Sequence, residues 1–279
     1  MLSKLAVKFA RMLRPVKKSI EDRVEIAKFN QRIKQASIAP GFDAANNIFK
    51  FSYQGTPIVF RVPDIRDYIS YNIVAKQTFF DIHDLERIRS FIPADGVVID
   101  AGSNIGNHAI YFATICQAAE VYCFEPQKEI FDILQQNIAL NNKTQAVMAF
   151  NCGLGEYKTR AASNFRDDVN ITDSVSQVNH GGLFLKEDAD GGFEIDSLDN
   201  LLSSRLTRLD FIKMDVQGFE EKVIRGGRGI IQRFKPIIQV EVMNKQELNE
   251  QILPLMTELG YRVKLVLEID YLFEPIASL

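Results

Sequence analysis

Three groups of polar residues follow apolar runs in this chain, and their types suit a small ligand that carries positive charge. The first group runs from Asp100 to His108 and contains two glycines; the second begins at Glu125; the third begins at Asp215. Glycine lets the backbone approach a ligand closely, because it has no Cβ. A carboxylate at the end of an apolar run repels a pyrophosphate and attracts a cationic or zwitterionic group.

The elements that must position these groups are short strands and the helices that follow them. Val97-Val98-Ile99 predicts a buried strand, the glycines predict a sharp turn, and Ile110 to Ile115 predicts a helix. Strand, tight turn and helix in this order open a nucleotide-binding α/β unit, in which the helix start presents free N–H groups.

The spacing argues against a plain dinucleotide site. In the pattern G-x-G-x-x-G the second and third glycines are replaced here by Asn104 and Asn107, and Asp100 would lie against a pyrophosphate. Glu125 stands 25 positions after Asp100, behind a second strand, where it is placed to accept hydrogen bonds from a ribose diol. S-adenosylmethionine (SAM) has an amino acid group, a sulfonium and a ribose, and it fits this arrangement. The cofactor-binding residues expected on this basis are Asp100, Gly102, Ser103, Asn104, Gly106, Asn107, His108, Glu125, Pro126, Asn151, Cys152, Gly153 and Asp215.

Several motifs in order resemble the FkbM family of SAM-dependent methyltransferases. They are Val-Ile-Asp-Ala-Gly-Ser-Asn-Ile-Gly-Asn (98–107), Phe124-Glu125-Pro126, Ser197-Leu198-Asp199-Asn200-Leu201-Leu202, and Phe211-Ile-Lys-Met-Asp-Val-Gln-Gly-Phe-Glu220. The resemblance covers about two-thirds of the chain, from Val97 onward. It implies methyl transfer to a hydroxyl of a sugar, polysaccharide or small metabolite. The family usually has Glu where this chain has Gln217.

The expected fold class is α/β: a doubly wound, mostly parallel, seven-stranded Rossmann-like methyltransferase sheet with an N-terminal helical and β-hairpin extension. We expect a basic amphipathic helical extension over residues 1–45, a pre-domain with a β-hairpin and helices over 46–95, and the SAM-binding domain over 96–279. Residues 155–195 are expected to be less regular, with strands near 158–165 and 192–195, and are a candidate acceptor-binding flap.

Two carboxylates are candidates for catalysis. Methyl transfer needs a base when the nucleophile is a neutral hydroxyl, and Asp215 is the leading candidate because it ends the strand beside that of Asp100. The alternative is that Asp215 braces the turn at Gln217-Gly218. Glu241 lies in an apolar strand, where burial would raise its pKa. The helix dipole alone would explain Glu220.

For other polar residues the sequence leaves more than one interpretation open. Asn151, with Cys152 and Gly153, follows the third strand, so its amide either bonds an adenine edge or forms a turn. His108 either touches the cofactor or is solvated or caps the helix. Asp215 and Glu241 without a third ligand are weak evidence for a cation, and we expect no metal.

Charge is distributed unevenly. Residues 1–40 carry ten Lys or Arg and three acids, whereas the remainder carries 23 basic and 33 acidic residues. Residues 1–34 therefore either dock on protein or contact an anionic membrane surface, and the acidic main part argues against nucleic acid. Three isolated cysteines and the lack of a membrane-spanning apolar run favour the cytoplasm, with association at the inner membrane face as a variant. The competing functions are an NAD-dependent oxidoreductase and a non-catalytic nucleotide-binding protein tethered by its N-terminus; oligomeric state is left open.

Overall fold

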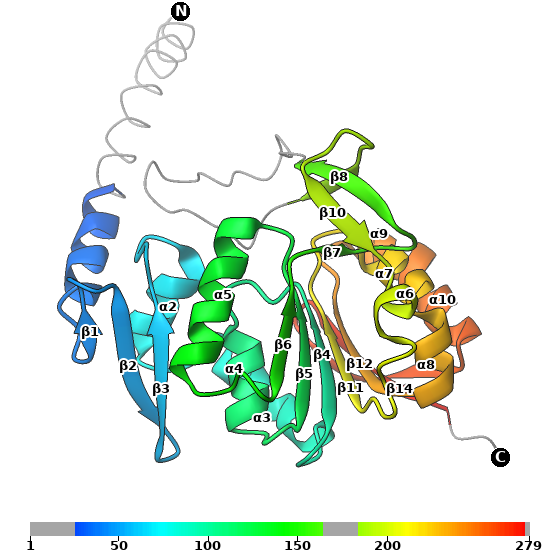
Figure 1. Cartoon of the computed structure of the whole chain (residues 1–279), viewed down its shortest axis with the longest axis horizontal. Helices are drawn as coiled ribbons and strands as arrows, with labels where there is room; N and C mark the ends of the chain where they lie inside the picture. Colours follow the sequence, from blue (N-terminus) through cyan, green and yellow to red (C-terminus); the bar gives the residue numbers. More distant parts are fainter. Residues whose placement is uncertain (1–25, 164–183, 277–279) are drawn as a thin grey trace, which may run out of the picture.

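A computed structural model describes residues 26–163 and 184–276 of the chain. Within these ranges, the strands form three sheets of three, four and seven strands. The seven-stranded sheet lies at the centre, with helices on both faces (Figure 1).

The central sheet confirms the expected fold class. Its strand order is β13-β14-β12-β11-β4-β5-β6, and β14 runs antiparallel to the other six strands. The strands are β4 (Val97–Ala101), β5 (Glu120–Phe124), β6 (Val147–Phe150), β11 (Phe211–Met214), β12 (Ile237–Glu241), β13 (Tyr261–Leu267) and β14 (Asp270–Pro275). The chain winds outward from β4 in one direction and from β11 in the other. Ligands of such sheets bind at the carboxyl ends of the strands where this reversal occurs.

The helices bury apolar residues against the two faces of this sheet. One core contains Tyr111 and Phe112 of α4, and the other contains Ile224 of α7 and Met256 of α10. The helices are α4 (Asn107–Thr114), α5 (Lys128–Leu140), α6 (Leu198–Leu202), α7 (Glu220–Gly226), α8 (Arg228–Phe234), α9 (Lys245–Glu247) and α10 (Leu253–Glu258).

The helical segment that follows β12 is divided. A π-helical turn, Leu248–Ile252, separates α9 from α10. Pro254 stands in the first turn of α10, where its missing N–H interrupts the regular hydrogen-bond ladder that a continuous α-helix would need.

The N-terminal extension contains the expected hairpin and two helices. The three-stranded sheet is β1 (Phe42–Asp43), β2 (Ile48–Tyr53) and β3 (Thr56–Arg61), followed by α2 (Tyr68–Lys76), α3 (Ile82–Ile88) and a 3₁₀ turn (Arg89–Phe91). Two asparagines, one in α5 and one at its C-cap, attach the hairpin: Asn137 accepts from Arg61 N at 2.6 Å, and Asn141 accepts from Val59 N at 3.0 Å. The hairpin thus shares a core with α4 and α5.

The expected strands near 158–165 and 192–195 are present, with two more. A small sheet of order β7-β10-β8-β9 is built from β7 (Gly153–Leu154), β8 (Thr159–Ser163), β9 (Leu185–Glu187) and β10 (Phe193–Asp196). Residues 164–183 of the candidate flap lie outside the described residues.

Residues 26–36 are helical, and residues 1–25 of the basic segment lie outside the described part of the chain. The proposed membrane contact of residues 1–34 therefore stays a prediction. Among the described helices, none is both long enough and apolar enough to cross a membrane.

Candidate active site

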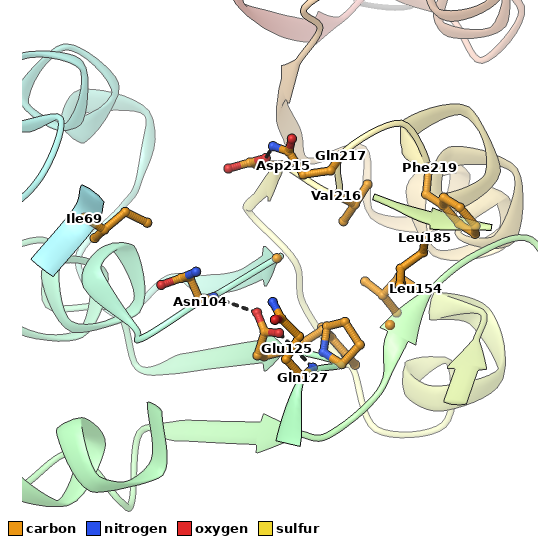
Figure 2. Close-up of a pocket in the computed structure, with 14 residues that line it drawn as sticks. Ile69, Asn104, Glu125, Gln127, Leu154, Leu185, Asp215, Val216, Gln217 and Phe219 are labelled. Atoms are coloured by element: carbon orange, nitrogen blue, oxygen red, sulfur yellow. Dashed lines mark hydrogen bonds between the residues drawn. The ribbon is translucent and has the colours of Figure 1, made fainter. Parts of the chain in front are cut away.

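A cleft opens where the carboxyl ends of β4, β5 and β11 meet, beside the reversal of strand order. Figure 2 shows Glu125 and Gln127 on one side, Asp215 and Gln217 on another, and Ile69 of α2 across the opening. The lining residues are Ile69, Gly102, Asn104, Phe124, Glu125, Pro126, Gln127, Gly153, Leu154, Leu185, Asp215, Val216, Gln217 and Phe219. Six of the residues expected from the sequence are among them.

The loop after β4 owes its shape to left-handed backbone angles at Gly102 (φ +79°) and Asn104 (φ +48°). A Cβ at residue 102 would lie 1.8 Å from the backbone oxygen of Asp215, so this position requires glycine. Asparagine tolerates the left-handed region better than most residues, which explains why Asn104 occupies a position where a dinucleotide site has glycine. The Nδ2 of Asn104 is buried and has no hydrogen-bond partner among the described residues. This donor is available to a ligand in the cleft.

Asp100 is fully buried, and its charge is met by a lysine. Neither carboxylate oxygen accepts a hydrogen bond within the described residues, but Lys213 Nζ lies 3.7 Å from Oδ1. Lys213 stands opposite Asp100 in the parallel pairing of β11 with β4. Burial raises the pKa of Asp100 to about 6, and the lysine opposes this rise. Asp100 does not line the cleft; it lies beneath the glycine loop.

Glu125 lines the cleft, and backbone amides hold it in place. Its Oε2 accepts from Asn104 N at 3.1 Å and its Oε1 from Gln127 N at 2.9 Å. Burial raises the pKa of Glu125 to about 7. Each carboxylate oxygen has a second lone pair, so the side chain can still accept hydrogen bonds from a ligand hydroxyl.

Asp215 and Glu241 are joined by the amide of Gln217. Gln217 Nε2 donates to Asp215 Oδ1 at 2.5 Å and to Glu241 Oε2 at 3.1 Å. Burial raises the pKa of Glu241 to about 9, and the charge of Asp215 adds to the rise. Burial also opposes ionisation of Asp215, but Lys213, Glu241 and Gln217 together lower its pKa below the usual range. At neutral pH the pair therefore holds one proton, on Glu241, and Asp215 is ionised.

The turn at Gln217-Gly218 is braced by Glu220, not by Asp215. The carboxylate of Glu220 accepts from Val216 N at 3.1 Å and from Gly218 N at 2.9 Å. The side chain is buried, so a helix dipole alone does not explain it. The sequence analysis did not assign this bracing role to Glu220, and it gave no role to Lys213 or to the amide of Gln217. For Lys213 the available signal was a charged residue inside an apolar strand.

Several expected residues support the loop from outside the cleft. Asn107 bonds the backbone of Phe80 through both side-chain atoms, and Ser103 Oγ donates to Asp100 O at 2.7 Å. Asn151 Nδ2 donates to the backbone oxygens of Glu125 and Pro126, as a turn-forming residue would. Gly106 begins α4.

Two more expected residues also lie outside this lining. Cys152 borders a separate surface hollow, whereas its neighbour Gly153 lines the cleft. His108 feels the charges of Lys213 and Asp215, and burial lowers its pKa to about 3. It is therefore neutral and is not the solvated histidine considered from the sequence. Within the described residues, no group of three or more His, Cys, Asp or Glu is arranged to hold a metal ion.

Comparison with known proteins finds several relatives that are named as methyltransferases. "Methyltransferase 1" of Beauveria bassiana is 29% identical over 148 residues, which are 48% of this chain and 59% of that protein. "2-O-methyltransferase NoeI" of Sinorhizobium fredii is 27% identical over 168 residues, 58% of this chain and 68% of the relative. The crystal structure of methyltransferase FkbM from Methylobacillus flagellatus aligns with a TM-score of 0.49 at 17% identity, covering 73% of this chain and 52% of that one.

A family model matches the part of the chain that carries the site. The family described as "Methyltransferase FkbM domain" matches residues 100–263, which include the glycine loop, Glu125, Asp215 and Glu241. This range is more than half of the chain. The chain therefore belongs to the FkbM methyltransferase family.

Proposed function

We propose that this chain transfers the methyl group of SAM to a hydroxyl on a sugar, a polysaccharide or a small metabolite. The observation that carries the proposal is geometric: Asp215 and Glu125 line one cleft, and Gln217 Nε2 joins Asp215 to Glu241. Burial opposes ionisation of Asp215, but Lys213 and these hydrogen bonds lower its pKa, whereas burial raises the pKa of Glu241 to about 9. A methyltransferase that acts on a neutral hydroxyl needs such a base.

The residues of the cleft fit the parts of SAM. Glu125 has lone pairs for the ribose diol, and Asn104 Nδ2 is an unused donor beside it. Leu154, Leu185 and Phe219 give the cleft an apolar side that suits an adenine (Figure 2). SAM supplies an activated methyl group, and the sulfonium that carries this group becomes a neutral thioether when the group is transferred. The acidic surroundings suit that positive charge, whereas they would repel the pyrophosphate of NAD.

Asp215 would accept the proton of the acceptor hydroxyl as the hydroxyl oxygen bonds to the methyl carbon and the carbon–sulfur bond breaks. Its side chain is 33% exposed, which leaves it open to an acceptor entering the cleft. The products are then a methyl ether and S-adenosylhomocysteine. The name of the NoeI relative specifies 2-O-methylation, and that name supports oxygen as the acceptor atom here.

The test is a transfer assay with methyl-labelled SAM against a panel of neutral saccharides, uronic acids and small hydroxylated metabolites. We expect label in a methyl ether of at least one class, with formation of S-adenosylhomocysteine. Thermal stabilisation by NAD but not by SAM, together with no labelled product, would favour the oxidoreductase. Binding of SAM without transfer to any acceptor would favour a non-catalytic role.

A further inference from the structure

Lys213 is a buried cation placed between the cofactor loop and the catalytic carboxylates. Its side chain is 5% exposed, and its Nζ lies 3.7 Å from Asp100 Oδ1 and 3.5 Å from Asp215 Oδ2. The same Nζ donates to the backbone oxygen of Gly102 at 3.2 Å. One ammonium group therefore contacts the acid beneath the loop, the loop itself and the base.

The loop and the base also meet through their backbones. Asp215 N donates to Ala101 O at 3.0 Å, and the α-carbon of Gly102 is so close to Asp215 O that no Cβ fits between them. A movement of either segment must therefore move the other. The ammonium of Lys213 is the charged part of this connection.

We propose that Lys213 is a positioning residue for methyl transfer, which keeps Asp215 as the ionised member of the Asp215–Glu241 pair and fixes that carboxylate against the cofactor loop. This inference rests on the function proposed above. It assigns Lys213 no contact with the methyl donor or the acceptor, because Lys213 does not line the cleft.

The other charged groups around the pair do not replace Lys213. From β4 and β14 the neighbours are Asp100 and Asp270, acids whose negative charges favour the protonated form of Asp215. From β12 the neighbour is Glu241, whose side-chain hydrogen bond lowers the pKa of Asp215 but which brings no positive charge. From α4 the neighbour is His108, which is neutral because burial lowers its pKa to about 3. Asp81, before α3, is a further acid that feels the charge of Lys213.

Lys213 is protonated at neutral pH. Burial opposes its positive charge, but the carboxylates of Asp215 and Asp100 outweigh burial and raise its pKa above the ordinary value. Without this charge, the buried Asp100 and the half-buried Asp215 and Glu241 would have no cation in contact among the described residues. An opposite charge at this distance typically lowers a carboxyl pKa by about one to three units.

The test is a ¹³C NMR pH titration of the carboxyl groups in the full chain, read without any acceptor. The signals are assigned with Asp215→Asn and Glu241→Gln, and the two carboxyls are treated as one coupled pair. The wild-type pair should show its upper midpoint at about 9. In Lys213→Met we expect this midpoint to rise by about one unit or more, and in Lys213→Arg to stay within about half a unit of wild type.

Two further variants guard against misfolding and against a general effect of losing a lysine. The double variant Asp100→Asn/Lys213→Met removes both buried charges and serves if the single variant does not fold. Its midpoint should lie above that of Asp100→Asn alone, although the loss of the acid offsets part of the rise. Lys235→Met is the matched control, since Lys235 Nζ donates to the backbone oxygen of Leu259 at 2.8 Å, away from the cleft. It should leave the midpoint unchanged.

An unchanged upper midpoint in Lys213→Met, or a midpoint in the double variant no higher than in Asp100→Asn alone, would overturn the proposal, whatever happens to stability. In the transfer assay, kcat of Lys213→Met at pH 7 should fall at least about tenfold and recover partly in Lys213→Arg. A wild-type chain that transfers no methyl group would defeat the proposed function instead, and it would leave the titration result readable.

Discussion

Two carboxylates in the same cleft are stabilised by different partners. Glu125 is held by the backbone N–H groups of Asn104 and Gln127, and burial raises its pKa to about 7. Asp215 lies 3.5 Å from the ammonium of Lys213 and has a lowered pKa. Backbone amides give an acid a fixed geometry, whereas a cation also keeps it charged. The first arrangement suits a hydrogen-bond acceptor for a ligand, and the second suits a base.

The comparison is tested most strongly by Asp215→Asn, for which we expect the largest effect, a loss of catalysis. Because asparagine cannot accept the hydroxyl proton, kcat should fall by about 10²- to 10⁴-fold, while the affinity for S-adenosylhomocysteine should change less than about threefold. The control is Asp210→Asn, since Asp210 lies just before β11, at the other end of the strand, and accepts from Val97 N. Full activity in Asp215→Asn would assign the base elsewhere.

The close contact between the loop and Asp215 is tested by Gly102→Ala, with Gly55→Ala as its control. Both glycines have a φ near +80°, but a Cβ at residue 55 has nothing within 4 Å, whereas at residue 102 it meets Asp215 O at 1.8 Å. Denaturant unfolding should show a loss of about 1–2 kcal/mol for Gly55→Ala, from backbone strain alone. Gly102→Ala should lose several kcal/mol, on the order of the larger single-mutation effects. Equal losses would mean that the loop yields easily.

The smallest effect, a change in the pH dependence of stability, is expected from Glu220. This acid follows Asp215 in the chain, but backbone N–H groups hold it, as they hold Glu125. Burial raises the pKa of Glu220 to about 7 in the folded chain from 4.5. Its contribution to stability is therefore complete below about pH 4.5 and is lost as the pH rises through about 7.

In Glu220→Gln the retained Oε1 can still accept from Val216 N and Gly218 N, but nothing titrates at that position. The melting temperature of the variant should fall less than that of wild type between pH 4.5 and 7, by about 2–4 °C. Identical pH slopes in calorimetric melts of the two proteins would show that Glu220 does not titrate in this window.

The sequence predicted the parts of the fold that depend on local patterns. Apolar runs such as Val97-Val98-Ile99 marked the buried strands, and the glycines at 102 and 106 marked the turn after β4. What it could not predict were contacts between distant segments. The bonds from Asn137 and Asn141 to β3 join residues 76 and 82 positions apart, and no periodicity encodes them.

The site shows the same division. Asp100, Glu125 and Asp215 were recognisable because each ends an apolar strand. Lys213 was visible in the sequence as a cation inside an apolar strand, yet its role depends on the register that sets it opposite Asp100. Gln217 bonds the carboxylate of Asp215, whereas Glu220 braces the turn. These roles depend on the geometry of one turn, which residue types alone do not determine.

The central claim is that Glu125 and the glycine loop bind the adenosyl part of SAM. The most direct measurement is calorimetric titration of S-adenosylhomocysteine into wild type, Glu125→Gln and the control Glu120→Gln, which changes an exposed acid at the other end of β5. We expect wild type and Glu120→Gln to bind alike, and Glu125→Gln to bind about tenfold more weakly, from losing a charge-assisted hydrogen bond. Equal affinity in all three proteins would contradict this account of the site.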